Sequence, residues 1–101
     1  MGAAGFTTTG TGSNAKEAFR AAVRQALYEE GHGGYTGTIA EKRDFVLLPL
    51  PQGTNPNDYA ALREHAYGLM DTHKSVSDKW GPAGAFDLGG GRYFFFGWAS
   101  T

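Results

Sequence analysis

The segment Tyr93-Phe94-Phe95-Phe96-Gly97-Trp98 constrains the fold most, because nearly every side chain in it is large and apolar. Side chains of a strand alternate between two faces, so Tyr93 and Phe95 share one face and Phe94, Phe96 and Trp98 the other. Two helices can cover one face of a small sheet. The second apolar face therefore predicts an interface and a homo-oligomer. The alternative is a central strand sandwiched by loops.

Length and charge exclude several classes of protein. The 101 residues make one small domain over residues 1–101, and the net charge is only −1. Nine basic and ten acidic side chains are spread along the chain, which argues against non-specific nucleic-acid binding. No apolar run approaches the roughly 20 residues of a membrane span, so no membrane contact is expected. The absence of cysteine excludes disulfides and favours a cytoplasmic protein.

Strand and helix signals alternate along the chain. Asn14 is a candidate cap for a first helix that Gly31 ends, and Ser13 is the competing cap. The segment Asn55-Pro56-Asn57-Asp58 is typical of a second helix start. The strand signals lie at residues 6–12, 38–40, 45–50, 85–88 and 92–98. The order predicts an α+β fold, with two helices packed on one small, mostly antiparallel sheet (β-α-β-β-α-β-β).

The second helix carries a regular apolar seam. Its members recur at steps of three and four residues: Tyr59, Leu62, Ala66, Leu69, His73, Val76 and Trp80. This spacing predicts one helix of about 24 residues, roughly 36 Å long, ending at Gly81-Pro82. His73 is expected at the edge of the core, and His65 on the surface.

The glycine-rich loop over residues 31–43 holds the candidate site. Glycine amides, hydroxyls and two cations suit a phosphate, a ribose or a carboxylate ligand. The expected ligand-binding residues are His32, Tyr35, Thr36, Thr38, Glu41, Lys42 and Arg43. A compact loop after the helix, with little role in the core, is the plainer interpretation.

Other motifs carry less chemistry. Gly10-Thr11-Gly12 before the first helix favours a tight turn over an anion site. Glu29, Glu30 and His32, with His65 or His73, match no metal motif, so no metal and no cofactor are expected. His32, Tyr35 and Glu41 could exchange protons, but no nucleophile motif accompanies them and no catalytic residue is assigned.

Three segments of the sequence resemble segments of a group of short uncharacterised proteins encoded by bacteriophages. The longest is Gly33-Gly34-Tyr35-Thr36-Gly37-Thr38-Ile39-Ala40-Glu41-Lys42, after a helix containing Ala18-Phe19-Arg20-Ala21-Ala22-Val23. Lys79-Trp80-Gly81-Pro82-Ala83-Gly84 and Phe95-Phe96-Gly97-Trp98-Ala99-Ser100 are the others. The resemblance covers the chain from about residue 14 onward. It implies that the protein acts in the host cytoplasm during infection, in an accessory or counter-defence task. No activity carries over from this group.

The sequence favours a non-catalytic binding module over an enzyme. Its glycine-rich loop would capture a phosphate-bearing small molecule or a host protein. The alternatives are a small enzyme acting on a nucleotide-like substrate, and a structural protein that assembles through its aromatic C-terminal strand.

Overall fold

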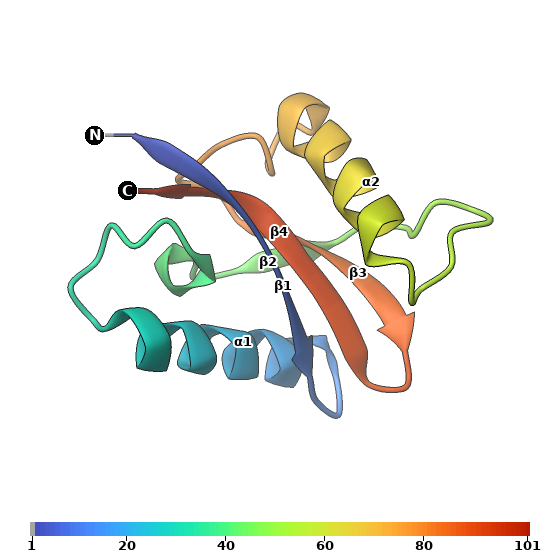
Figure 1. The fold of residues 1–101 in the computed structure, drawn as a ribbon, viewed down its shortest axis with the longest axis horizontal. Helices are drawn as coiled ribbons and strands as arrows, with labels where there is room; N and C mark the ends of the chain where they lie inside the picture. The colour runs from blue at the N-terminus through green and yellow to red at the C-terminus, as the bar shows by residue number, and fades with distance from the viewer. Residues whose placement is uncertain (1) are drawn as a thin grey trace.

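A computed structural model describes residues 2–101 as a four-stranded sheet with one helix on each face (Figure 1). The strands lie in the order β1-β4-β3-β2, and only the β2–β3 pair is parallel. The elements are β1 (Ala3–Thr11), α1 (Ala15–Glu30), the 3₁₀ turn η1 (Ile39–Glu41), β2 (Phe45–Leu47), α2 (Tyr59–Thr72), β3 (Ala83–Gly89) and β4 (Arg92–Ser100). The predicted α+β fold is confirmed. The strand expected at residues 38–40 is instead the turn η1.

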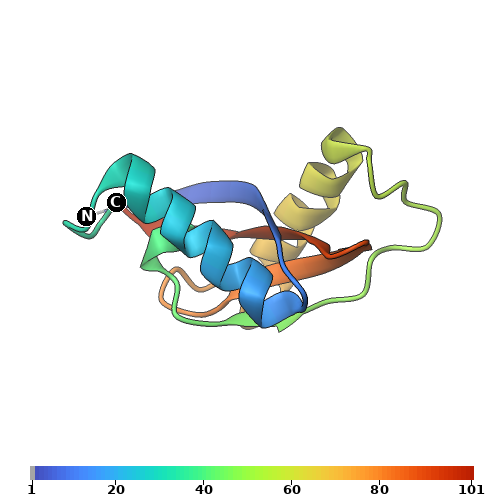
Figure 2. The ribbon, with the colours of Figure 1, turned by 90° about the horizontal axis from the view of Figure 1, so that it is seen from below.

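Strand β4 lies at the centre of the sheet and is covered on both faces. Tyr93 and Phe95 pack in the α1 core, whereas Phe94 and Phe96 pack in the α2 core, as the alternation predicts. The expectation that both helices share one face is wrong, because α1 and α2 lie on opposite faces (Figures 1 and 2). The aromatic strand is therefore enclosed within the chain, and its apolar faces no longer indicate an interface.

The α1 core is built around three rings. Phe19 of α1 lies 5.1 Å from Phe45 and 5.7 Å from Phe95, measured between ring centroids. The helix begins as predicted, because the Asn14 Oδ1 accepts a hydrogen bond from the Glu17 amide at 2.9 Å. It ends at Gly31, where a φ of +84° suits glycine and the amide donates to the Leu27 carbonyl.

The α2 helix is shorter than predicted. It begins after Asp58, whose carboxylate caps the Ala61 amide, and it ends at Thr72. His73 turns the chain away, because its Nδ1 accepts hydrogen bonds from the amides of Ser75 and Val76 at 3.2 and 3.3 Å. His73 is half-buried and His65 exposed, as expected.

The apolar seam nevertheless continues past the end of α2. Val76 lies in the turn that follows the helix and is buried there. The apolar spacing therefore indicates which residues are buried, but it does not require that they belong to a helix. Trp80 was expected on the same seam and is 64% exposed instead. Leu69 is half-buried, and Met70 beside it enters the core.

Close backbone approach explains two glycines. A Cβ on Gly84 of β3 would overlap the ring of Phe96, and one on Gly10 of β1 would overlap the Ala18 carbonyl of α1. The Gly10-Thr11-Gly12 phrase thus lets β1 and α1 meet, which agrees with its interpretation as a tight turn. Neither α1 nor α2, the helices of the described chain, has the length and apolar character needed to cross a membrane.

Candidate functional site

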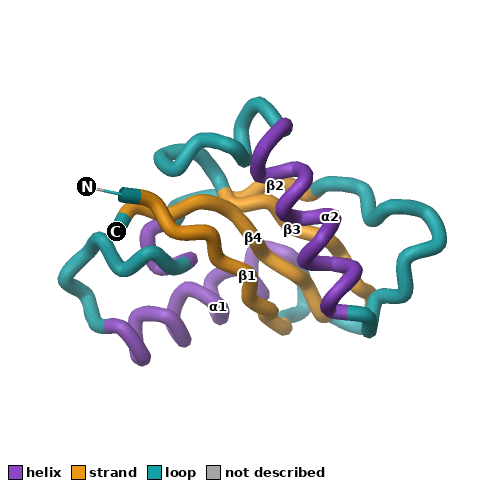
Figure 3. The backbone as a smooth tube through the Cα atoms, turned by 45° about the horizontal axis from the view of Figure 1, so that its top comes forward, coloured by secondary structure: helices purple, strands orange, loops and turns teal. Residues whose placement is uncertain are grey.

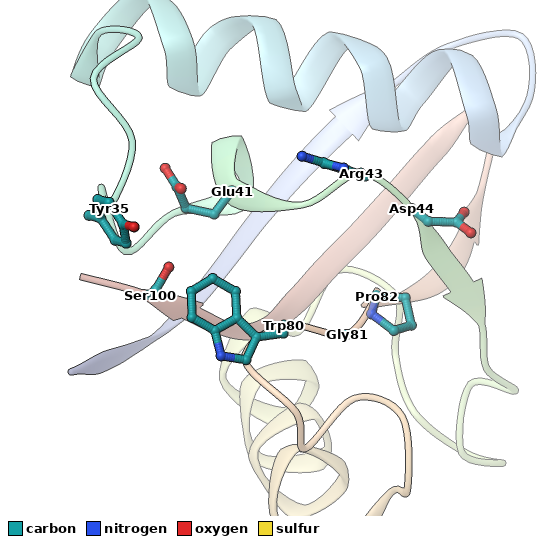
Figure 4. Close-up of a pocket in the computed structure, with 8 residues that line it drawn as sticks. All are labelled: Tyr35, Glu41, Arg43, Asp44, Trp80, Gly81, Pro82 and Ser100. Carbon is teal, nitrogen blue, oxygen red and sulfur yellow. The ribbon is translucent and has the colours of Figure 1, made fainter. Parts of the chain in front are cut away.

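A cleft of about 690 Å³ opens between the glycine-rich loop and the segment before β3 (Figure 4). Tyr35, Glu41, Arg43 and Asp44 line it from the loop side. Tyr35 and Trp80 stand at one end of the cleft, on either side of Ser100 (Figure 4). The opposite wall and the floor consist of Trp80, Gly81, Pro82 and Ser100.

The second half of the loop is an ordered part of the fold. The Thr36 hydroxyl donates to Glu41 Oε2 at 2.8 Å, and the Thr36 amide donates to the same oxygen at 3.1 Å. Because Thr36 has only one hydroxyl hydrogen, Thr38 donates to the Thr36 oxygen at 2.8 Å. Thr38 in turn accepts from the Ala40 amide and caps η1. These hydroxyls are therefore used within the chain.

These hydrogen bonds set the charge of Glu41. Partial burial raises the pKa of this carboxyl, but bonds from the Thr36 amide, the Thr36 hydroxyl and the Tyr35 amide lower it more. The net pKa lies below the ordinary value. Glu41 is thus an ionised carboxylate at the rim of the cleft.

Lys42 is buried and does not line the cleft. Its side chain is only 5% exposed, and its ammonium donates to the carbonyl oxygens of Lys79 at 3.0 Å and Gly81 at 2.8 Å. Burial lowers the pKa of Lys42, and the Asp78 carboxylate raises it in part. Lys42 is consequently a clamp between the loop and the 79–81 segment.

Two aromatic side chains are presented to solvent at the cleft. Tyr35 is 56% exposed and has a φ of +55°, a left-handed conformation that non-glycine residues seldom adopt. Trp80 is held by its backbone, since its amide donates to Asp78 Oδ1 at 2.9 Å. The Lys79 ammonium lies 5.2 Å from the Trp80 ring centroid. Backbone strain such as the positive φ of Tyr35 is often associated with a binding role.

A second, basic hollow adjoins the cleft. It has a volume of about 420 Å³ and shares Arg43 and Asp44 with the cleft. Its other polar lining residues, Lys16 and Arg20, come from the first turns of α1. Within residues 2–101 the only ion pair is Arg20–Glu17 at 3.5 Å, so Arg43 has no carboxylate partner. Three cations therefore surround this hollow.

The structure brings together only part of the predicted site. Tyr35, Glu41 and Arg43 line the cleft, whereas Thr36 and Thr38 bond within the loop and Lys42 is buried outside the cleft. His32 is exposed and lines neither hollow, so it does not meet Tyr35 and Glu41 as a proton-exchange group would need to. The residues that sequence reasoning missed are Lys16, Arg20, Asp44, Trp80, Gly81, Pro82 and Ser100.

The remaining motifs concern a metal ion and an anion. No group of three or more His, Asp or Glu side chains among residues 2–101 could hold a metal ion. In the first turn of α1, the Glu17 amide donates to the Asn14 side chain.

The comparisons with known proteins add no family. No protein-family model, curated protein or solved structure matches this chain.

Proposed function

We propose that this protein is a small non-catalytic binding module for a nucleotide-like ligand. The observation that supports this proposal is the pair of adjoining hollows, one with two exposed aromatic rings and one with three cations, which share Arg43. A ligand with a planar ring and phosphate groups matches both. The volume of the cleft falls within the usual range for small-molecule sites, about 300–1,000 Å³.

The aromatic end would hold the ring. Large apolar side chains are rarely left in water without a reason when they cluster beside a cleft. Trp80 and Tyr35 both line the cleft and are exposed, and a nucleobase stacked on an aromatic side chain gains about 1–3 kcal/mol. Trp80 is expected to contribute most because its ring is the larger of the two.

The basic end would hold the phosphates. The Arg43 guanidinium can donate two parallel hydrogen bonds to a phosphate, and such charge-assisted bonds are about twice as strong as neutral ones. Lys16 and Arg20 would pair with further phosphates in the adjoining hollow. Glu41 and Asp44, beside Arg43, would accept hydrogen bonds from sugar hydroxyls and disfavour a bare anion.

Catalysis is not part of the proposal. Of the hydroxyl groups near the cleft, that of Ser100 is buried, and that of Thr36 is already engaged by Glu41 and Thr38. The resemblance to phage-encoded proteins adds a context, in which an infecting phage would use this module for an accessory or counter-defence task.

The test is calorimetric titration with a nucleoside and with its mono- and triphosphates. We expect affinity to rise with the number of phosphates and to fall with added salt. Trp80→Ala should weaken binding by about 5- to 150-fold, because stacking contributes about 1–3 kcal/mol. Arg43→Gln should remove most of the difference between nucleoside and nucleotide.

Two controls match these variants. Tyr28→Ala removes an aromatic ring that is more exposed but lies outside both hollows, and Arg63→Gln removes an exposed guanidinium on α2. Neither should change affinity. Absence of binding by every ligand, or equal affinities in Trp80→Ala and Tyr28→Ala, would overturn the proposal. Conversion of a nucleotide to a new product would replace it by the enzyme alternative.

A further inference from the structure

Strand β1 forms one border of the sheet and leaves its outer edge open (Figure 3). It is nine residues long and pairs with β4 alone. The opposite border, β2, has only three residues and is followed by Pro49 and Pro51, which cannot donate to a neighbouring strand. Among residues 2–101, only β1 therefore offers a long, unpaired edge.

The register identifies the backbone groups that point outward. The bonds from Thr101 N to Gly2 O and from Gly12 N to Gly91 O flank the ladder at its two ends. In an antiparallel pair such bonds recur at every second residue, so the even-numbered residues of β1 bond to β4. The odd-numbered residues turn their amides and carbonyls outward: Ala3, Gly5, Thr7, Thr9 and Thr11. Within residues 2–101, no segment outside the β1–β4 ladder bonds to the backbone of these five.

Nothing in β1 protects this edge. Natural sheets block their borders with charged residues, proline, bulges or very short strands. The sequence Ala-Ala-Gly-Phe-Thr-Thr-Thr-Gly-Thr contains no charge and no proline, and its register with β4 is unbroken. Threonine, which occupies four of the nine positions, is also well suited to strands.

The edge is complementary to itself. An antiparallel pair of β1 strands centred on Thr7 opposes Thr7 to Thr7, Gly5 to Thr9, and Ala3 to Thr11. The last two pairs each occur twice by symmetry, which makes five pairs in all. Each pair can exchange two hydrogen bonds, so the interface has about ten. Because β1 carries no charge, the pairing puts no like charges opposite each other within the strands.

We infer that β1 is the contact surface of a symmetric homodimer, in which the two sheets join edge to edge into one. A second copy of the chain is the partner because it supplies an extended strand of the same length with the same outward groups. The two-fold axis passes beside Thr7, as a symmetric interface requires. This interface uses neither face of the sheet and leaves the aromatic strand β4 enclosed.

The test combines light scattering with amide hydrogen exchange. Added salt is included, because Glu29 and Glu30 lie beside Thr7 and Thr8 and their charges would otherwise repel between copies. We expect twice the mass of one chain, and slow exchange of the Thr7 and Thr9 amides. Thr7→Lys puts like charges opposite each other at the axis and should give a monomer in which the Thr9 amide exchanges fast.

Thr72→Lys is the matched control, since Thr72 is equally a threonine but lies on the exposed end of α2. It should remain a dimer. A wild-type mass of one chain at the highest soluble concentration would overturn the inference. A dimer in which the wild-type Thr7 and Thr9 amides exchange fast would overturn it as well, because the contact would then lie elsewhere. The exchange measurement needs no variant, so a misfolded Thr7→Lys protein does not affect it.

Discussion

The ammonium of Lys42 and the carbonyl oxygen of Gly81 are 2.8 Å apart, although the two residues are 39 positions apart in the chain. The same ammonium also bonds to the Lys79 carbonyl, so one side chain holds both residues that flank Trp80. Trp80 itself is exposed and belongs to neither core, so this clamp fixes the backbone on both sides of it.

Lys42→Met should destabilise the fold. The methionine retains the aliphatic stem but leaves two carbonyls without their donor, which costs about 1–3 kcal/mol. Urea unfolding would measure the loss, and the Gly81 amide should exchange faster with solvent. The exposed Lys74→Met is the control. Equal unfolding midpoints for the two variants would show that the clamp contributes nothing.

Glu41 should make stability depend on acidic pH. Its pKa in the folded chain lies below the ordinary value of 4.5, since hydrogen bonds from Thr36 and Tyr35 outweigh the effect of burial. Its contribution to stability is therefore present above pH 4.5 and is lost as the pH falls through the lowered pKa. As the pH falls through this range, the difference in free energy of unfolding between wild type and Glu41→Gln should become smaller.

Titration of the Glu41 carboxyl also tests the role of Thr36. Thr36→Val removes the hydroxyl donor and should raise the pKa of Glu41, as an NMR titration of the side-chain carboxyl would show. An unchanged titration in Thr36→Val would mean that the hydroxyl does not bond to Glu41 in solution.

Gly84→Ala should destabilise the protein, because the added methyl group would overlap the Phe96 ring on the neighbouring strand. Overpacking of this kind typically costs about 1–3 kcal/mol. Gly68→Ala is the counterpart, since no atom lies near that position on α2 and alanine favours helix by roughly 0.5–1 kcal/mol. Thermal unfolding should shift in opposite directions, and a shift in the same direction would contradict the packing of β3 on β4.

Leu62→Ala should cost more than Leu69→Ala. Leu62 is fully buried against the sheet, and removing a buried leucine costs about 2–5 kcal/mol. Leu69 lies on the same helix but is only half-buried, so a smaller part of its side chain leaves water on folding. If the two variants unfold at the same urea concentration, the buried face of α2 differs from the one described.

Local signals predicted the parts of the fold that depend on neighbouring residues. The Asn14 cap, the glycine stop at Gly31 and the alternation along β4 each involve residues a few positions apart, so the sequence carries them directly. The end of α2 was missed because apolar spacing reports burial. Val76 is buried by a turn, and the periodicity therefore continued where the helix did not.

The candidate site depended on distant contacts, which local patterns do not contain. Of the loop residues that the composition indicated, Tyr35, Glu41 and Arg43 line one cleft. It could not indicate Trp80, because the cleft exists only where the loop meets the segment before β3. The hydroxyls and the lysine that suggested a ligand are instead used to hold the loop itself together.

The central position of β4 also decides when this chain can fold during its synthesis. Ala3 pairs with Ser100, and both cores need the aromatic side chains of β4, so α1 and α2 have no sheet to dock on until almost all of the described chain has left the ribosome. Contacts between such distant residues slow folding, and nascent chains expose their apolar residues meanwhile. A ribosome-stalled chain that ends before β4 should therefore lack both cores at once.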